Sequence, residues 1–316
     1  MEVARPCELC GSTNRIPRYF FKGIRVVKCA RCGLVFGHPD REVDARDLYD
    51  SRYFEERKEY FFSTLESGKA PAATGGPAKS FQEGLELLGA HRKQGRLLDV
   101  GCAVGSFLSL AQADGWEVHG VDVSEYATSC ARNRLGAAIH TGDLVDAGFP
   151  ESYFDVVTLW DVVEHLAHPR SVLSEVHRIL KGDGILLLDT PNEEALIRRI
   201  AFLLYHLFGR QVTYPASKLY HVFHRYYFSE NTLGRLLTEC GFEIIQAKRK
   251  PIPREKGRGT PWERTIVKAF GVLERPLGMD FELLVLARRK RAAGTSQAQS
   301  ILQIPFQPAT QAGALS

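Results

Sequence analysis

The sequence lacks a long uncharged apolar run. Its longest apolar stretch, at 196–208, spans thirteen residues and includes two arginines and a histidine. A stretch this short and this charged does not cross a bilayer. Near the start, charged residues and Cys7 stand where the apolar core of a leader would be. We therefore expect a cytoplasmic protein with neither a cleaved leader nor a transmembrane segment.

The sequence also lacks internal repeats and a strong charge imbalance. The formal net charge is +4 over 316 residues, with 44% hydrophobic and 25% charged residues. These values are typical of a globular protein, and the charge is too weak to indicate nucleic-acid binding by itself. The length allows one large domain with appendages, or two domains.

The chain divides into four predicted regions. A cysteine-containing segment covers 1–40, a connector covers 41–78, a regular region covers 79–291, and a tail covers 292–316. The connector contains GKAPAATGGPAK, which is typical of a linker or mobile loop. The tail has neither periodicity nor charge, and we expect it to be disordered.

Strand and helix patterns alternate through the regular region. Short apolar runs predict strands at 96–100, 117–123, 137–143, 154–160, 185–191, 242–249 and 280–289. Helices are expected at 106–115, 124–136, 168–184 and 229–242, with Ser124 and Ser229 as N-caps and Gly182 near the end of the third. This alternation predicts a doubly wound α/β fold with a mostly parallel sheet.

Two CxxCG sequences stand close together in the first region. Their cysteines are Cys7, Cys10, Cys29 and Cys32, and eighteen residues separate the two pairs. This spacing predicts a zinc ribbon, in which a glycine after each pair permits the tight turn around the thiolates. About forty residues bury little core, so a metal would supply roughly 10 kcal/mol of folding free energy. Four thiolates leave no open coordination position, which indicates a structural zinc.

A glycine turn follows the first strand of the regular region, in the sequence DVGCAVGSF. A dinucleotide fingerprint would place glycines at 103 and 106, which are Ala103 and Ser106. The stretch instead resembles motif I of class I S-adenosylmethionine (SAM) methyltransferases, an acid followed by spaced glycines. The resemblance implies that Asp99, Gly101, Ala103 and Gly105 bind SAM, with Ala103 replacing the usual glycine.

Two acids follow at the ends of later strands. Asp122 ends the second strand, where a carboxylate accepts hydrogen bonds from both ribose hydroxyls, as it also does in NAD-binding proteins. Asp143 follows the third strand, and the resemblance implies that it accepts from the adenine amino group. The alternative role for Asp143 is that of a turn-forming acid.

The segment LWDVVEHLAHPRSVLSEVHRILKGDGILLLDTPN resembles the part after strand four in small-molecule methyltransferases, including the quinone-biosynthesis type. The resemblance covers about 80–250. It implies a seven-stranded sheet in which the strand at 280–289 is antiparallel. It also implies that the acid and the Glu-His pair in this segment border the methyl-transfer site.

Methyl transfer to a hydroxyl or carbon acid requires a base. Candidates are His165, His224 and Glu164, and each could equally have a structural role. Trp160 is a candidate wall of the cofactor site, because an aromatic lining favours a sulfonium cation that loses its charge; core packing is its alternative role.

These observations predict SAM-dependent methyl transfer to a small molecule, a sugar, or a glycan or lipid intermediate. In similar enzymes a zinc domain helps to shape the acceptor site, and a segment resembling that of Tyr49, Tyr53 and Phe54 closes over the cofactor. The insertion at 192–228 would be a lid, or its apolar helix would rest on a membrane surface.

Two alternatives remain open. One is an RNA methyltransferase whose zinc ribbon recognises the substrate, since residues 248–291 hold thirteen Lys/Arg against five Asp/Glu. The other is a zinc-ribbon binding module attached to a non-catalytic SAM fold.

Overall fold

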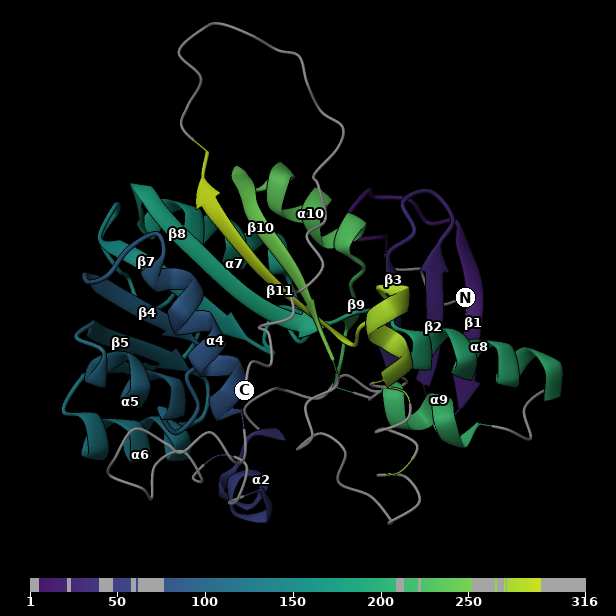
Figure 1. The fold of residues 1–316 in the computed structure, drawn as a ribbon, viewed down its shortest axis with the longest axis horizontal. Helices are drawn as coiled ribbons and strands as arrows, with labels where there is room; N and C mark the ends of the chain where they lie inside the picture. Colours follow the sequence, from purple (N-terminus) through teal and green to yellow (C-terminus); the bar gives the residue numbers. More distant parts are fainter. Residues whose placement is uncertain are drawn as a thin grey trace, which may run out of the picture.

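The structure is a computed structural model of the chain (Figure 1). It describes residues 6–21, 24–39, 48–57, 61, 77–208, 213–220, 223–251, 265, 270 and 272–290. The predicted tail, most of the GKAPAATGGPAK loop and much of the basic stretch at 248–291 therefore lie outside the described residues.

The larger of two sheets has seven strands in the order β10-β11-β8-β7-β4-β5-β6. Its strands are β4 (Arg96–Val100), β5 (Glu117–Asp122), β6 (Ala138–Thr141), β7 (Phe154–Trp160), β8 (Leu180–Pro191), β10 (Phe242–Lys250) and β11 (Glu282–Arg289). Strand β11 is antiparallel to both of its neighbours, whereas β4 to β8 pair in parallel. The predicted doubly wound, mostly parallel sheet is confirmed, including the antiparallel strand.

Helices cover both faces of this sheet because successive strand residues point to opposite sides. Leu97 and Leu284 face a core formed with α4 (Ala78–Gly89), α5 (Ser106–Ala113) and α6 (Glu125–Leu135). Leu98 and Leu283 face a second core, formed with α7 (Pro169–Ile179) and α10 (Glu230–Glu239). Strands that are buried on both faces have continuous apolar sequences, and for this reason they could be predicted from the sequence.

Helix ends follow the predicted capping residues, with one correction. Ser124 and Ser229 each accept a hydrogen bond from a backbone N–H of the first turn, as expected of N-caps. The helix predicted over 168–184, however, ends at Ile179, and β8 begins at once. Leu180 pairs with Phe154 in the sheet, and the Lys181 ammonium lies 2.7 Å from the Asp155 carboxylate. These contacts draw the chain into the sheet before Gly182.

The smaller sheet is antiparallel and combines distant parts of the sequence. It consists of β1 (Arg15–Phe21), β2 (Ile24–Cys29), β3 (Val35–Pro39) and β9 (Tyr226–Tyr227), in that order. Helices α8 (Leu196–Phe208) and α9 (Tyr214–Leu219) pack on it through a separate apolar cluster that includes Tyr19, Tyr220 and Tyr227. We refer to these four strands and two helices as the ribbon unit, which stands beside the larger sheet in Figure 1.

No helix among the described residues is both long and apolar enough to span a membrane. Helix α8 corresponds to the longest apolar run of the sequence. It lies against the smaller sheet, with Arg198 and Ala201 buried on its inner face.

Candidate active site and metal site

The turn between β4 and α5 has an unusual backbone. Gly101, Ala103 and Gly105 all have positive φ angles, of 75°, 48° and 81°. A side chain at Gly101 would collide with Val162, so this position accepts only glycine. Ala103 adopts the left-handed conformation despite its Cβ, at a cost of about 1 kcal/mol. The sequence reveals the turn, but this strain becomes visible only in the structure.

Asp122 at the end of β5 holds this turn. One of its carboxylate oxygens accepts from the backbone N–H of Ala103 and the other from that of Ser124, both at 2.9 Å. Burial raises the pKa of Asp122, and the two amide donors partly offset this effect. The carboxylate is thereby fixed at the carboxyl edge of the parallel strands, where α/β sheets bind ligands.

A groove of about 670 Å³ lies next to Asp122, between the connector and the ends of β5 and β6. Its lining consists of Tyr49, Asp50, Val123, Ser124, Glu125, Tyr126, His140, Thr141, Gly142 and Asp146. This volume is within the range of small-molecule and cofactor sites. Asp143 is exposed and lies in the loop after β6, between the groove-lining residues Gly142 and Asp146.

The connector closes over this edge of the sheet through α2 (Ser51–Glu56) and the residues before it. Phe54 is buried in an apolar cluster with Val104 of the glycine turn and Ala127 of α6. The Tyr49 carbonyl accepts a hydrogen bond of 2.6 Å from the Ser124 hydroxyl. The connector therefore packs on the same turn that Asp122 holds.

Glu164, His165 and His224 come together beyond the end of β7. One potential ligand or proton-accepting atom of each lies within 4.8 Å of the other two. The rings of His165 and His224 meet edge to face, with centroids 4.6 Å apart. The structure thus assembles all three predicted catalytic residues, although His224 is sixty positions from the other two in the sequence.

Backbone and side-chain contacts hold this cluster in place. The Glu164 carboxylate is buried and accepts from the Thr190 hydroxyl at 2.9 Å, while the Glu164 carbonyl accepts from the N–H groups of Arg225 and Tyr226. His165 Nδ1 lies 2.9 Å from the Phe223 carbonyl oxygen. Since a carbonyl only accepts, Nδ1 of His165 carries the proton.

Tyr49 connects the cluster with the groove. Its hydroxyl is 3.4 Å from His165 Nδ1, and its carbonyl is bonded to Ser124 at the groove. Burial raises the pKa of Tyr49 well above its ordinary value, and the nearby Tyr53 and Glu164 add to this effect. Tyr49 therefore stays protonated over the physiological pH range.

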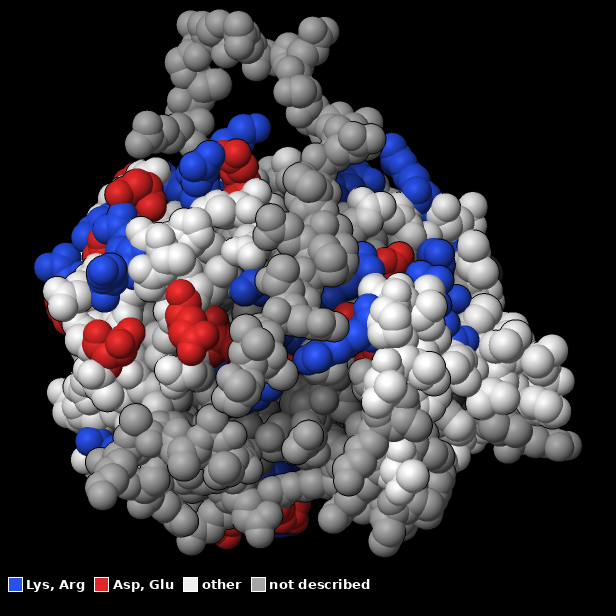
Figure 2. Space-filling model, in the orientation of Figure 1, with Lys and Arg blue, Asp and Glu red and all other residues white. Residues whose placement is uncertain are grey.

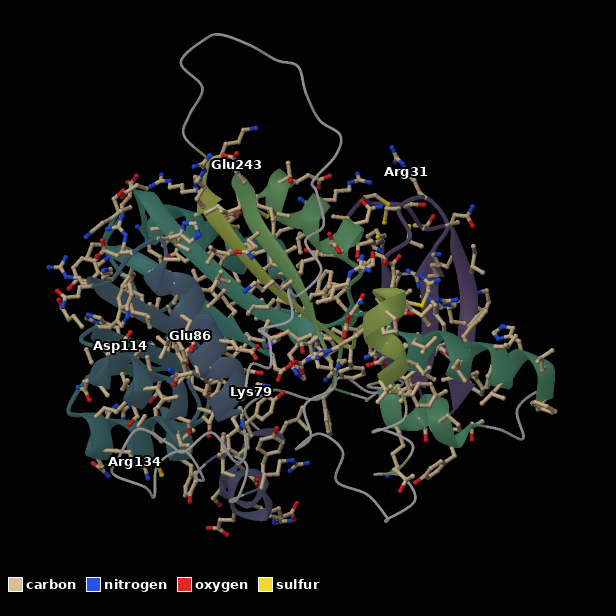
Figure 3. All side chains as sticks on the ribbon, in the orientation of Figure 1. Arg31, Lys79, Glu86, Asp114, Arg134 and Glu243 are labelled. Atoms are coloured by element: carbon tan, nitrogen blue, oxygen red, sulfur yellow. The ribbon has the colours of Figure 1, made fainter. Side chains whose placement is uncertain are left out.

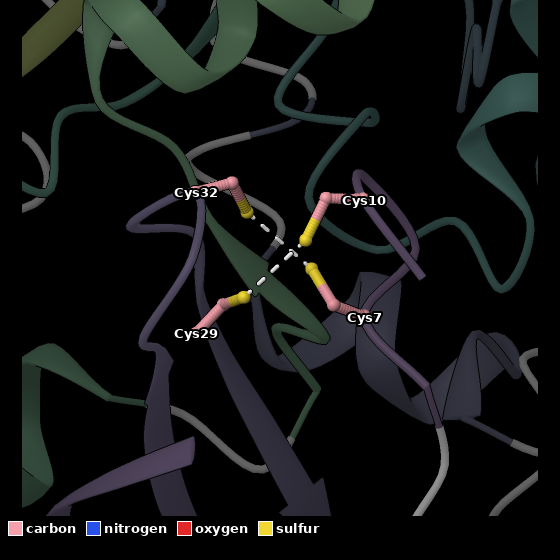
Figure 4. Close-up of side chains that lie close together, drawn as sticks. All are labelled: Cys7, Cys10, Cys29 and Cys32. Carbon is pink, nitrogen blue, oxygen red and sulfur yellow. Dashed lines mark hydrogen bonds between the residues drawn. The ribbon is translucent and has the colours of Figure 1, made fainter. Parts of the chain in front are cut away.

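The four ribbon cysteines converge from two loops (Figure 4). The Sγ atoms of Cys7 and Cys32, and those of Cys10 and Cys29, are 3.5 Å apart, and all four lie within 4.8 Å of one another. Tetrahedral zinc with Zn–S bonds of 2.3 Å requires S–S separations of about 3.8 Å. The donor set and its spacing therefore fit one zinc ion.

The knuckle backbone supports thiolate ligands. The glycine after each cysteine pair has a positive φ angle, 70° at Gly11 and 81° at Gly33, as the tight turns require. Burial raises the pKa of Cys29, but hydrogen bonds from the amides of Cys32 and Arg31 and from the neighbouring thiols outweigh it and lower this pKa to about 6.

Comparison with known proteins identifies the fold family. A family model described as a methyltransferase domain matches residues 76–247, which is more than half of the chain. The chain belongs to the class I SAM-dependent methyltransferase family.

Two curated relatives illustrate the match. A Mycolicibacterium smegmatis protein named "Probable S-adenosylmethionine-dependent methyltransferase" is 32% identical over 157 residues, covering 49% of this chain and 55% of its own length. A ubiquinone biosynthesis O-methyltransferase of Pseudomonas aeruginosa is 30% identical over 156 residues, covering 47% of this chain and 65% of its own length. The matched part therefore spans roughly half to two thirds of these relatives.

Among solved structures, a chain from the complex between the Haloferax volcanii Trm112 methyltransferase activator and a methyltransferase superposes with a TM-score of 0.53. The match covers 80% of this chain and all of that chain, at 16% sequence identity. At this identity the likeness establishes the fold of the methyltransferase domain and nothing further.

Within the methyltransferase domain, two predicted cofactor residues have contacts inside the protein. Asp99 is buried and accepts a hydrogen bond of 2.7 Å from the Thr158 hydroxyl of the adjacent strand. Burial raises its pKa to about 8. The Trp160 ring packs against Phe81 and Phe107, with centroids 5.0 and 5.1 Å away. Phe107 is buried in the core, and direct cofactor contact by Asp99 and Trp160 stays a prediction.

Sequence reasoning missed a buried ionic network next to the methyltransferase domain, inside the ribbon unit. Arg198 is 2% exposed, and its guanidinium lies 3.5 Å from the buried Glu193 carboxylate. Arg18 of β1 approaches the same carboxylate at 3.2 Å, and the Tyr220 hydroxyl donates to it at 2.9 Å. An arginine within an apolar helix was the available signal, but the partners of Glu193 come from three separate segments: β1, α8 and the end of α9.

Proposed function

We propose that this protein transfers the methyl group of SAM to a small-molecule acceptor that loses a proton to the His165–His224 pair. The observation that carries the proposal is the meeting of Glu164, His165 and His224 beside Tyr49, which also borders the groove next to Asp122. In-line methyl transfer with deprotonation requires that the acceptor reach the base and the cofactor at the same time. A residue that contacts both the histidine cluster and the groove meets this requirement.

The residues that would hold SAM are those of the turn and of the two strand ends. Bound SAM supplies an electrophilic methyl group on a sulfonium. Asp122 would accept hydrogen bonds from the ribose hydroxyls, and Asp143 one from the adenine amino group. The strained turn at 101–105 lets backbone approach the rest of the cofactor. The groove volume and the fixed Asp122 carboxylate support this placement.

His165 is the better placed of the two bases. Because its Nδ1–H donates to the Phe223 carbonyl, Nε2 is the basic atom of the neutral ring and would accept the proton of the acceptor. The buried Glu164 carboxylate, which has an oxygen within 4.8 Å of a His165 ring nitrogen, would stabilise the resulting imidazolium by its charge. His224, packed edge to face on His165, keeps the ring in this orientation.

A small acceptor fits the surroundings of the cluster better than a folded RNA does. The cysteine end of the ribbon unit packs into the core of the methyltransferase domain, and Arg170 of α7 donates to the carbonyls of Glu8 and Leu9. This contact supports a bracing role for the zinc ribbon. A phenol, sugar or lipid intermediate has a hydroxyl proton that one histidine base can remove. One curated relative is an enzyme of ubiquinone biosynthesis.

The test separates cofactor binding from proton removal. Asp122→Ala should weaken SAM binding, measured by calorimetry, by at least a hundredfold. His165→Gln should leave SAM affinity within threefold and lower transfer of labelled methyl groups by at least a hundredfold, in a screen of phenols, sugar nucleotides and lipid intermediates. Unchanged SAM binding by Asp122→Ala, or full transfer by His165→Gln, would refute the proposal.

A further inference from the structure

Exposed apolar side chains are concentrated on the ribbon unit and its neighbouring segments. Eleven large apolar side chains are strongly exposed in the described part of the chain, and only Val145 lies in the main body of the methyltransferase domain. Six of the others are Phe20, Leu203, Leu207, Phe208, Val272 and Leu277, which are 48–73% exposed. Such a concentration indicates an interaction surface, because single exposed apolar residues are common on proteins whereas clusters of them usually mark a binding site.

Helix α8 carries the centre of this surface. Its inner side is fixed by the buried Arg198 and by Tyr205, whose hydroxyl accepts from the Phe20 N–H at 3.2 Å. Leu203 and Leu207, one helical turn apart, therefore point outward and are 54% and 66% exposed. A helix that is apolar on its outer side is built to contact something apolar.

The helical segment at 272–277 adjoins α8 and extends the same surface. The Leu196 N–H donates to the Met279 carbonyl at 2.9 Å, and the Met279 N–H donates to the Glu274 carbonyl at 3.0 Å. Val272 and Leu277 of this segment are 73% and 54% exposed. In Figures 1 and 2 the two helices lie on the side of the molecule that holds the smaller sheet, where many of the described atoms are white.

Among the described residues, the exposed charges around these apolar groups are positive. In the described residues of 6–39, 192–220 and 272–280, the exposed Lys and Arg include Arg25, Arg199, Lys218 and Arg275, and every Asp or Glu is buried or half-buried. Lys218 lies over the exposed Tyr214 ring at 5.3 Å. Arg31, labelled in Figure 3, is also exposed but belongs to the opposite, cysteine end of the ribbon unit.

We infer that this apolar and basic surface seats the protein on an anionic lipid bilayer, with α8 lying in the interface. Outward leucines on a helix enter the acyl boundary, while flanking Lys and Arg attract anionic headgroups. The absence of exposed acids in these ranges favours this partner over a protein surface of mixed charge. The inference concerns a binding surface and does not depend on the identity of the methyl acceptor.

Vesicle sedimentation of the full chain tests the inference. The wild type should bind vesicles of phosphatidylglycerol and phosphatidylcholine at least tenfold more tightly than vesicles of phosphatidylcholine alone, and high salt should weaken this binding. Leu203→Glu together with Leu207→Glu should reduce binding at least tenfold. Val145→Glu, a matched change at an apolar residue of 52% exposure, should bind as the wild type does.

Three outcomes would overturn the inference. The first is a wild type that does not bind anionic vesicles, and the second is an equal loss in Val145→Glu. The third is a stable dimer in light scattering that the double α8 substitution dissociates, which would assign the surface to a second copy of the chain. An unchanged circular dichroism spectrum and SAM affinity show that each variant is folded.

Discussion

The methyltransferase domain and the ribbon unit are stabilised in different ways. The domain buries two continuous apolar cores, one on each face of a sheet whose strands are separated by helices from the same stretch of chain. The ribbon unit instead joins β1–β3 to β9, nearly two hundred residues away, around four cysteines and a buried Glu193–Arg198 pair. The first region depends on apolar burial, whereas the second combines a smaller apolar cluster with a four-cysteine cluster that fits zinc and with buried charges.

This difference locates the proposed chemistry at the junction of the two regions. Glu164 and His165 belong to the domain, whereas His224 lies two residues before β9 of the ribbon unit. The cluster of Glu164, His165 and His224 is therefore complete only when both regions are folded and in contact. The groove next to Asp122 needs only the domain and the connector. Damage to the ribbon unit should thus impair transfer more than SAM binding.

The largest expected effect is that of removing a cysteine ligand. Cys29→Ser should lose the bound zinc and expose the ribbon unit to protease, because about 10 kcal/mol of metal-linked folding free energy is withdrawn. SAM affinity should stay within threefold of the wild type. Metal analysis and limited proteolysis check this, with Cys240→Ser, a cysteine outside the cluster, as control. A Cys29→Ser protein that keeps one zinc per chain and resists protease would show that the ribbon unit does not depend on this cysteine.

A smaller effect is expected from breaking the buried ion pair. Arg198→Met should lower the free energy of unfolding by about 3 kcal/mol, because Glu193 stays buried with Arg18 as its one remaining cation among the described residues. Adding Glu193→Gln should restore part of the loss. Denaturant titration measures both, and Arg199→Met, the exposed neighbour, should change stability by less than about 0.5 kcal/mol. A double variant less stable than Arg198→Met alone would show that the pair is not the source of the effect.

The smallest expected effect, taken over a single pH unit, concerns Asp99 in the domain core. Its folded pKa of about 8 exceeds the ordinary value of 3.8, so the folded state keeps a proton that the unfolded chain releases. The stability contributed by Asp99 is therefore complete below about pH 4 and is lost as pH rises toward 8. Asp99→Asn can still accept from Thr158 and should remove this dependence.

The measurement is urea unfolding of wild type and Asp99→Asn at several pH values. The stability of the variant relative to the wild type should rise by about 1 kcal/mol between pH 6 and 7. Parallel pH curves for the two proteins would show that Asp99 does not keep its proton in the fold.

Local patterns explain how much of the domain could be predicted. Ser124 and Ser229 cap helices because their hydroxyls reach N–H groups three residues away, a contact that depends on neighbouring sequence alone. The helix predicted to reach Gly182 was too long because its end is set by strand pairing with Phe154, a contact that local propensity does not contain.

The sequence by itself determined the doubly wound sheet, the glycine turn, the Glu-His segment and the four-cysteine cluster. Each of these depends on period, capping or fixed spacing within a short stretch of chain. Only the tertiary structure decided that β9 completes the ribbon sheet, that Tyr49 connects the groove with His165, and that Arg18 of β1 meets Glu193. Those contacts join segments far apart in the chain. They form only when both regions are folded and their charged and aromatic groups are buried against one another.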